Sequence, residues 1–411
     1  MSDPRVPLSV LPQEWRRLFP YQPAFLNKMQ SECFDVAFMS DHSMVISSPT
    51  GSGKTAVLEL AVARLFTANA RGGDGQSRCL GVYMAPLKSL CRERVVDWQQ
   101  KLSPLGLKVV ELTGDSSDET DERTVAAADL IVTTPEKWDA FSRFRRDAQG
   151  IVGRVGLLLV DEIHQINDVS RGPTLEAVIA RMMTISQGSE VRGMPIAKLR
   201  VLAASATISN AEDIQSWFGP SCVVRQFDDS YRPVPLTWRV LTYPMHQLYS
   251  FDKALIAKLP YVVREHAAGR PALVFCQSRN ACKQAAQGLS TGPPLVHSQP
   301  HHDHLGRAAS RLHDKGVATM VRLGCAYHDA SLELNDRQVI EGLFLEGALP
   351  VLACTSGLAQ GVNLPARLVV VMNTAKYSKT LAGYEEITRI ETMQMAGRAG
   401  EPACVTPSDP V

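Results

Sequence analysis

The most regular feature of this chain is a series of short, continuously apolar runs that alternate with longer stretches of helical periodicity. In the first half, these runs occupy residues 43–48, 80–85, 130–133, 156–160 and 201–205. Apolar runs of this length between polar segments are typical of strands buried on both faces. Strands that alternate with helical segments favour a parallel sheet covered by helices. The pattern therefore predicts an α/β fold for this half of the chain.

A second series of the same kind begins near Pro271, and its clearest strands are predicted at 272–276, 350–354 and 368–372. Between the two series, residues 227–235 contain two prolines and a cluster of charges, which favours a linker. We therefore predict two α/β domains in tandem, each with a parallel sheet. The predicted boundaries are an N-terminal extension over 1–21, a first domain over 22–228, a linker over 229–245, a second domain over 246–400 and an atypical tail over 401–411.

Composition narrows the class of protein without deciding its partner. Hydrophobic residues make up 45% and charged residues 21%, which is globular composition. No apolar run approaches the roughly 18 residues that cross a bilayer, and the N-terminus has no basic region followed by an apolar stretch. We expect an intracellular protein without a membrane partner, whose nine cysteines are reduced and mostly buried. The net charge of +1 leaves nucleic acid open, because a local groove can bind phosphates in a neutral protein.

A glycine-rich loop follows the first predicted strand and precedes a helical pattern at 56–66. Glycines allow a tight turn whose N–H groups, together with the helix N-terminus, point at phosphates. A lysine at this place reaches the β and γ phosphates, and the next hydroxyl holds Mg²⁺. Residues 58–62, LELAV, fit the core face of the helix behind the loop. We predict a loop that binds the phosphates of a nucleotide together with Mg²⁺, made of Thr50, Gly51, Ser52, Gly53, Lys54 and Thr55.

A second signal for nucleotide chemistry is the sequence DEIH, which begins at Asp161 directly after the strand at 156–160. A carboxylate at the end of a buried strand is badly solvated unless it meets a cation, so Asp161 is placed to hold Mg²⁺. Glu162 is suited to orient or deprotonate an attacking water. Taken alone, the sequence fits a helix cap equally well. Paired with the phosphate loop, it indicates hydrolysis of a nucleoside triphosphate.

These residues resemble those of the superfamily-two helicases, specifically the superkiller-like branch with DEIH or DEVH boxes. The resemblance covers roughly residues 19–400, and further blocks follow in the family's order. In the first half they are Gln30 and residues 85–90 (APLKSL), 133–138 (TTPEKW) and 205–207 (SAT). In the second half they are residues 274–279 (VFCQSR), 327–330 (YHDA, where the family usually has YHHAG), 355–366 (TSGLAQGVNLPA) and 394–400 (QMAGRAG).

Within the branch, the chain resembles the meiotic crossover DNA helicases, which are 3′-to-5′ translocases of the eukaryotic nucleus. This resemblance is carried by residues 30–34 (QSECF), 112–115 (LTGD), 134–138 (TPEKW) and 171–176 (RGPTLE). Spliceosomal and activating-complex helicases of the branch share several of these blocks. An RNA helicase therefore stays open as an alternative, since contacts to the 2′-hydroxyl cannot be identified in a sequence.

The resemblance implies two RecA-like domains with ATP in the cleft between them. Gln30 would bind the adenine edge, and hydrolysis would change the closure of the cleft. The second domain would add Gly361, Gln394 and Arg398 to the nucleotide site. Single-stranded nucleic acid would be bound through its phosphates, and the candidate contacts are Lys88, Thr134, Arg279 and Thr355. Tyr384 lies where relatives place a strand-splitting hairpin, although an ordinary exposed or packed tyrosine is the alternative.

Two stretches depart from the helicase pattern. His297, His301, His302 and His304 invite a metal site, but they lack regular ligand spacing, so a solvated polar loop or helix is favoured. Relatives follow the last motif with an arginine that acts as a finger on the γ-phosphate, and here Gly400 is followed by Glu401. Such a finger contributes roughly 10³–10⁵ to turnover.

The unusual tail predicts a C-terminally truncated chain without the winged-helix and ratchet domains of its relatives. Two functions therefore follow from the sequence. One is an active ATP-dependent translocase, which the intact Lys54, Asp161 and Glu162 favour. The other is a hydrolysis-impaired module that binds ATP and nucleic acid, which Glu401 favours.

Overall fold

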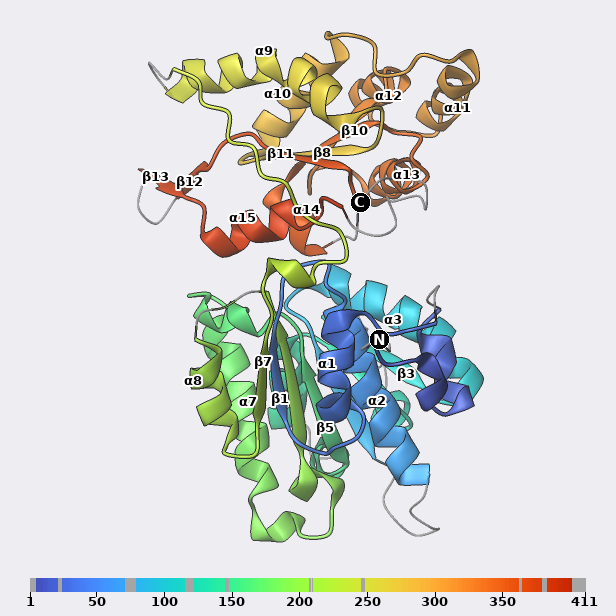
Figure 1. Cartoon of the computed structure of the whole chain (residues 1–411), viewed down its shortest axis with the longest axis vertical. Helices are drawn as coiled ribbons and strands as arrows, with labels where there is room; N and C mark the ends of the chain where they lie inside the picture. Colours follow the sequence, from blue (N-terminus) through green and yellow to red (C-terminus); the bar gives the residue numbers. More distant parts are fainter. Residues whose placement is uncertain are drawn as a thin grey trace. The chain divides into compact units, whose positions relative to one another are not determined.

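The chain divides into two compact units, Met1–Tyr231 and Arg232–Val411, each with its own parallel sheet (Figure 1). The computed structural model describes residues 5–20, 24–70, 79–114, 122–144, 148–206, 208, 210–244, 248–361, 364–378 and 383–400. The predicted α/β class with two tandem domains is confirmed. The division falls inside the predicted linker, between Tyr231 and Arg232.

The sheet of the first unit has seven parallel strands in the order β3-β4-β2-β5-β6-β1-β7. The five strands predicted from the sequence are all present, with ends shifted by one residue at most, because each is buried along its whole length. The strands are β1 (Met44–Ser47), β2 (Leu80–Met84), β3 (Val109–Leu112), β4 (Leu130–Thr133), β5 (Val155–Val160), β6 (Arg200–Ser205) and β7 (Val223–Gln226).

Helices cover both faces of this sheet. In Figure 1, α1, α2 and α3 lie on one side of the strands, and α7 and α8 lie on the other. Successive residues of a strand pack into hydrophobic cores on opposite faces of the sheet. Met44 and Ile46 face the α1–α3 side, and Val45 faces the opposite side. The helices are α1 (Lys28–Ala37), α2 (Lys54–Ala70), α3 (Lys88–Leu102), α4 (Glu122–Ala126), α5 (Pro135–Phe144), α6 (Ala148–Gly153), α7 (Gly172–Ser186) and α8 (Ala211–Phe218).

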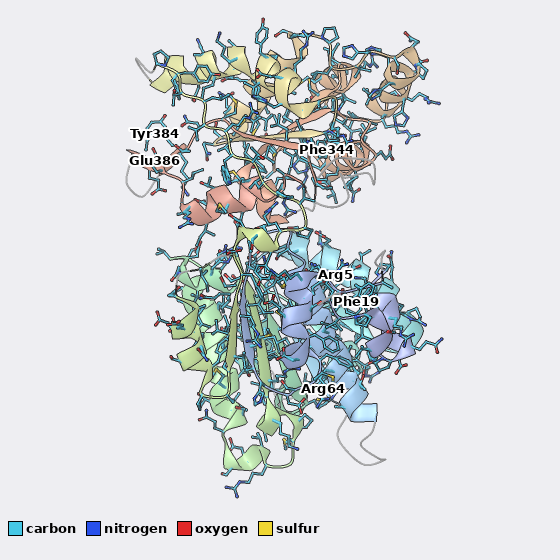
Figure 2. The ribbon with its side chains drawn as sticks, in the orientation of Figure 1. Arg5, Phe19, Arg64, Phe344, Tyr384 and Glu386 are labelled. Atoms are coloured by element: carbon cyan, nitrogen blue, oxygen red, sulfur yellow. The ribbon has the colours of Figure 1, made fainter. Side chains whose placement is uncertain are left out.

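The predicted N-terminal extension belongs to the core of the first unit. Its two short 3₁₀ helices, Leu8–Val10 and Gln13–Leu18, bury Leu11 and Trp15 against the α1–α3 side of the sheet. Phe19 is buried in the same cluster (Figure 2). The segment that precedes the helicase-like motifs therefore contributes to the stability of this unit.

The second unit has a four-stranded parallel sheet in the order β11-β8-β10-β9 and a two-stranded antiparallel hairpin, β12–β13. The three predicted strands are confirmed, and the fourth, β9, was not predicted. The strands are β8 (Ala272–Cys276), β9 (Cys325–His328), β10 (Val351–Thr355), β11 (Leu368–Val371), β12 (Ala375–Ser378) and β13 (Gly383–Glu386). The helices are α9 (Leu248–Ala267), α10 (Arg279–Ser290), α11 (Gln299–Ala309), α12 (Lys315–Arg322), α13 (Leu334–Leu345), α14 (Ser356–Gly361) and α15 (Arg389–Ala396).

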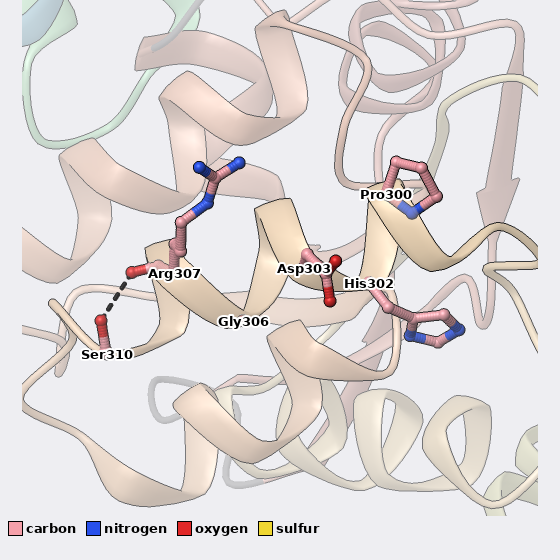
Figure 3. A pocket seen from close by; sticks show the side chains of 6 residues that line it. All are labelled: Pro300, His302, Asp303, Gly306, Arg307 and Ser310. Atoms are coloured by element: carbon pink, nitrogen blue, oxygen red, sulfur yellow. Dashed lines mark hydrogen bonds between the residues drawn. The ribbon is translucent and has the colours of Figure 1, made fainter.

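His301, His302 and His304 lie on a helix, α11, and His297 is exposed just before it, which agrees with the favoured solvated loop or helix. His301 Nε2 lies 2.5 Å from the Ala348 carbonyl oxygen, and His304 is 3.4 Å from Glu346. Figure 3 shows a shallow hollow on this helix, where Ser310 Oγ donates to the Arg307 carbonyl at 2.7 Å. The hollow is lined by Pro300, His302, Asp303, Gly306, Arg307 and Ser310.

Two further expectations can be compared with the described residues. The eight cysteines among them are all buried and unpaired with one another in disulfides, which confirms the predicted buried thiols. Within the same ranges, no helix combines the length and the apolarity that crossing a bilayer requires.

The start of α7 offers a test of how tightly the first unit is packed. A Cβ atom on Gly172 would lie 2.1 Å from the backbone oxygen of Ile166. Gly172→Ala therefore forces a backbone shift and should lower the free energy of unfolding by about 1–3 kcal/mol. Urea denaturation followed by tryptophan fluorescence measures this, because Trp98 and Trp138 are fully buried in this unit.

The matched control for this substitution is Gly150→Ala in α6, where a Cβ atom meets nothing within 4 Å. Alanine at that helical position should leave the unfolding free energy unchanged or raise it by up to about 1 kcal/mol. Equal losses in the two variants would show that the close approach at Gly172 has no energetic consequence.

Candidate nucleotide-binding site

The glycine-rich loop joins β1 to α2 and is curled at two glycines. Gly51 has a φ of 80° and Gly53 a φ of 90°, a region that favours glycine. A Cβ atom on Gly53 would also lie 2.4 Å from Gln30 Nε2, so a side chain there would displace the Gln30 amide as well as strain the backbone. This turn leads directly into the N-terminus of α2, where backbone N–H groups are available to an anion. The loop therefore has the form of a phosphate cradle.

Hydrogen bonds inside the loop hold its lysine over the turn. Lys54 Nζ donates to the carbonyl oxygens of Ser48 at 2.8 Å and Pro49 at 3.0 Å. The hydroxyl of Ser52 donates to Pro49 O at 2.7 Å and lies 2.6 Å from the Ser48 hydroxyl. A bound phosphate would compete with these carbonyls for the ammonium group, which is the chemistry predicted for Lys54.

Gln30 ties the first helix to this loop. Its side chain accepts from Asn27 N at 2.9 Å, and Asn27 Oδ1 accepts from Gln30 N at 2.8 Å, which caps α1 reciprocally. The amide of Gln30 also donates to Gly53 O at 3.3 Å, and Asn27 Nδ2 donates to Ser52 O at 2.8 Å. Gln30 is buried, so in this structure it supports the loop. Its contact with adenine stays a prediction.

Asp161 and Glu162 follow the buried strand β5. Both oxygens of Asp161 have partners: Oδ1 accepts from Glu162 N at 3.0 Å and Oδ2 accepts from the Tyr83 hydroxyl at 2.6 Å. Glu162 has a φ of 54°, a left-handed conformation that costs a non-glycine residue on the order of 1 kcal/mol. Such strained residues cluster at functional sites, which agrees with the predicted catalytic role of Glu162.

His164 joins the DEIH sequence to the block that begins at Ser205. Its Nδ1 lies 3.2 Å from Ser205 Oγ and 3.3 Å from Glu162 Oε2. Burial, with a smaller contribution from the charge of Lys54, lowers the pKa of His164 to about 4 even though the charge of Asp161 acts in the opposite direction. The imidazole is therefore neutral at pH 7. Thr207, the last residue of the block, lies outside the described residues.

The residues predicted to hold Mg²⁺ fit that ion in their chemistry. Thr55 supplies a hydroxyl and Asp161 a carboxylate, and Mg²⁺ prefers such hard oxygen ligands. Thr55 is the second residue of α2, after β1, and Asp161 follows β5; only β6 separates these strands in the sheet. Parallel strands end at the same edge, so both ligands belong to one edge of the first sheet.

Comparison with known proteins identifies two helicase segments in the chain. Residues 27–214 match the DEAD/DEAH box helicase family, and residues 254–402 match the helicase conserved C-terminal domain. The chain thus combines a DEAD/DEAH box helicase domain with a helicase conserved C-terminal domain. The matched segments correspond to the first and second units and contain all of the predicted nucleotide-site residues.

Several curated proteins are similar to nearly all of this chain. The "ATP-dependent DNA helicase MER3 homolog" of Oryza sativa subsp. japonica is 38% identical over 98% of the chain and 34% of its own length. The "Probable ATP-dependent DNA helicase HFM1" of Homo sapiens is 40% identical over 95% and 27%. The "Activating signal cointegrator 1 complex subunit 3" of Gallus gallus is 35% identical over 93% and 17%. The chain thus spans about a third or less of the length of these relatives.

The second unit of the helicase carries the other predicted nucleotide ligands. Gln394 lies on α15 and is buried, and Gly361 is the last residue of α14, which packs against α15. Arg398 follows α15, and its carbonyl oxygen accepts from Ala366 N at 3.0 Å. These three residues therefore belong to neighbouring elements of one unit. Their approach to ATP stays a prediction, and Glu401 lies outside the described residues.

The predicted nucleic-acid contacts lie at strand ends in both units. Lys88 begins α3 after β2, and Arg279 begins α10 after β8. Thr355 ends β10 beside Cys276 of β8. Thr134 follows β4 and is buried, and its hydroxyl accepts from Lys137 N at 3.4 Å at the start of α5. Contact with a phosphate backbone stays a prediction for all four residues.

Tyr384 lies in a hairpin, as the resemblance implies. It belongs to β13, pairs with Tyr377 of β12 and is 61% exposed (Figure 2). The antiparallel hairpin is therefore present between the last two helicase blocks. Its action on a duplex stays a prediction.

A set of polar residues behind the predicted magnesium ligands was not predicted from the sequence. Glu59 lies on the core face of α2 as predicted, but this buried carboxylate accepts from Trp98 Nε1 at 2.9 Å and from Lys101 Nζ at 2.7 Å. Tyr83 and Arg94 reach Asp161 and Thr55 from the same region. The available signal was an acidic residue in the middle of an apolar helix, because such a charge is retained only with a partner.

The low pKa of His164 predicts an acid-dependent loss of stability. The unfolded chain binds a proton near pH 6.5, whereas the folded chain excludes it until about pH 4. Stability is therefore fully present above pH 6.5 and should fall by roughly 3 kcal/mol as the pH drops towards 4. Urea denaturation between pH 4 and 7.5 should show this loss, and His164→Asn should remove it.

The control for this titration is His313→Asn. His313 is exposed, and the hydrogen bond that its Nδ1 donates to Glu333 raises its pKa, so its contribution has the opposite sign. The variant should keep the acid-dependent loss of the parent protein. If His164→Asn loses as much stability in acid as the parent protein does, groups other than His164 cause that loss.

Proposed function

We propose that this chain is the motor of an ATP-dependent 3′-to-5′ DNA helicase that acts in meiotic crossover formation in the nucleus. Its cofactors would be ATP and Mg²⁺, and its substrate single-stranded or branched DNA. The observation that carries the proposal is the meeting of a phosphate-cradle loop, a lysine and two carboxylates at one edge of a parallel sheet. The resemblance to meiotic crossover helicases supplies the biological role.

Each residue of the first unit has a distinct task in hydrolysis. The loop N–H groups and Lys54 would bind the phosphates, and Thr55 and Asp161 would hold Mg²⁺, which neutralises charge on the phosphate oxygens when bound. Glu162 would take a proton from the attacking water. Its carboxylate lies beside the neutral His164, which does not cancel its charge.

The second unit would complete the nucleotide site. Gln394 and Arg398 would reach the triphosphate, and Gly361 would approach it with its backbone. Hydrolysis would then change the contacts that both domains make with the nucleotide. In other motors of this kind, a cleft between domains closes during turnover. Within the first unit, the contact between His164 and Ser205 links the region of the hydrolytic carboxylate to the block that begins at the last residue of β6.

DNA is favoured over RNA by the names of the relatives from rice and human, both of which are called ATP-dependent DNA helicases. Lys88, Thr134, Arg279 and Thr355 would contact the strand through its phosphates. Such contacts carry little sequence information, which suits a translocase.

ATP hydrolysis with and without single-stranded DNA tests this function. Hydrolysis should rise several-fold with DNA, and Glu162→Gln should reduce turnover at least about 100-fold, because general-base catalysis contributes roughly 10²–10⁴. Glu265→Gln, on an exposed part of α9, is the matched control and should keep full turnover. RNA of the same sequence should stimulate less than DNA.

A different result would favour a hydrolysis-impaired binding module. In that case the protein binds nucleotide, but with DNA present it hydrolyses ATP no faster than the Glu162→Gln variant. Glu401→Arg then restores the arginine of the family's last motif. A gain of several orders of magnitude would assign the impairment to Glu401, since an arginine finger contributes roughly 10³–10⁵.

A further inference from the structure

A polar network that is partly buried lies behind the two predicted magnesium ligands. It consists of Tyr83 on β2, Glu59 on α2, and Arg94, Asp97, Trp98 and Lys101 on α3. None of these residues belongs to the nucleotide loop or to the DEIH sequence. The network nevertheless contacts both, through Asp161 and Thr55.

The contact with Asp161 is made by the phenol of Tyr83. The hydroxyl donates to Asp161 Oδ2 at 2.6 Å, while Glu162 N donates to Oδ1 at 3.0 Å. Tyr83 is 1% exposed, and its ring meets the edge of Trp98 at 5.1 Å between centroids. Burial and the charge of Asp161 raise the pKa of Tyr83, so the hydroxyl remains a donor. The carboxylate is therefore fixed at both oxygens.

The contact with Thr55 is made by the guanidinium of Arg94. Its Nη2 lies 3.5 Å from Thr55 Oγ1, and its Nη1 donates to Asp97 at 3.1 Å. The guanidinium carbon lies 5.5 Å from the ring centroid of Trp98, which holds the flat group beside the indole. Arg94 therefore reaches the threonine hydroxyl from an anchored position.

Glu59 anchors the indole on which both contacts depend. Trp98 Nε1 and Lys101 Nζ donate to the same oxygen of Glu59, and Lys101 also contacts Asp97 at 3.1 Å. Two carboxylates and two cations thus compensate one another between α2 and α3. A buried charge without its partner is strongly destabilising, so the group is held as a unit.

We propose that Tyr83 and Arg94 are positioning residues of the magnesium site, which set the orientation of the Asp161 carboxylate and the Thr55 hydroxyl. The inference rests on the proposed function, because it concerns the metal that accompanies ATP. Partners of this kind orient metal ligands, and their loss typically costs 10–100-fold in metal affinity.

The test is the Mg²⁺ dependence of nucleotide binding, with a fluorescent non-hydrolysable ATP analogue as the probe. Tyr83→Phe keeps the ring and removes only the hydroxyl, and Arg94→Met keeps the length of the stem. Both should raise the Mg²⁺ concentration at half-maximal binding about tenfold, and both should leave the affinity measured in EDTA unchanged. Arg94→Lys, which keeps the charge, should recover part of the shift.

The matched control is Tyr231→Phe. Its hydroxyl donates to Glu32 at 2.9 Å in the same unit, and neither predicted ligand is its hydrogen-bond partner. This variant should keep the Mg²⁺ midpoint of the parent. Thermal unfolding of each variant separates a local effect from a loss of fold, and Tyr83→Phe is conservative enough to stay folded.

Two results would overturn the inference: an unchanged Mg²⁺ midpoint in folded Tyr83→Phe and Arg94→Met, or an equal change in EDTA, which would show a general effect on the loop. Binding needs no turnover, so the failure of the proposed function is a separate outcome. A parent protein that binds the analogue with Mg²⁺ but never hydrolyses ATP would refute the motor and leave the positioning roles standing.

Discussion

Parallel pairing of β2, β5, β6 and β1 brings four chain segments to one edge of the first sheet. The registers match Met84 with Val160, Val160 with Ala203, and Ser47 with Ser205. The residues that follow these strands are the phosphate loop, the DEIH sequence and the two blocks shared with helicases. Segments more than 100 residues apart therefore meet because strands of similar length end together. All of the chemistry assigned to this unit depends on that shared edge.

Several residues at this same edge have backbone conformations or buried polar side chains that lower the stability of the fold. Glu162 adopts a left-handed conformation, Gly51 and Gly53 need positive φ angles, and His164 is buried without its charge. These costs are offset by the apolar strands beneath them, which are buried along their whole length. The sheet interior is thus a stable base on which an unfavourable arrangement of polar groups can persist.

The sequence was sufficient to predict the central strands and the identity of the loop, and physical reasons explain the rest. The central strands are buried on both faces, so they appear as continuous apolar runs. Three strands without such runs were missed: β3 contains Glu111, β7 is half-exposed with Arg225 and Gln226, and β9 ends in His328. The loop was predicted because its glycines and lysine stand at fixed spacing after a strand.

Residues that act through contacts across the core could not be predicted in this way. Glu59 is one position in an apolar helix, and its partners Trp98 and Lys101 are about 40 residues distant on another helix. Nothing in a local pattern relates them. Gln30 shows the converse case, because its motif indicates a ligand contact, whereas its hydrogen bonds show that it also closes a capping box and supports Gly53. The structural and the ligand-binding roles of such a residue can be compared only once the fold is known.

The neutral imidazole of His164 limits how the hydrolytic carboxylate and the Ser205 block can communicate. Its Nδ1 is close to both Glu162 Oε2 and Ser205 Oγ, and a neutral ring offers one hydrogen or one lone pair there. With the hydrogen, the two oxygens compete for a single bond. With the lone pair, only the serine hydroxyl can donate, because an ionised carboxylate only accepts. In the tautomer with the hydrogen on Nδ1, a change at Glu162 therefore alters what remains for Ser205, so the two are linked without any movement of charge.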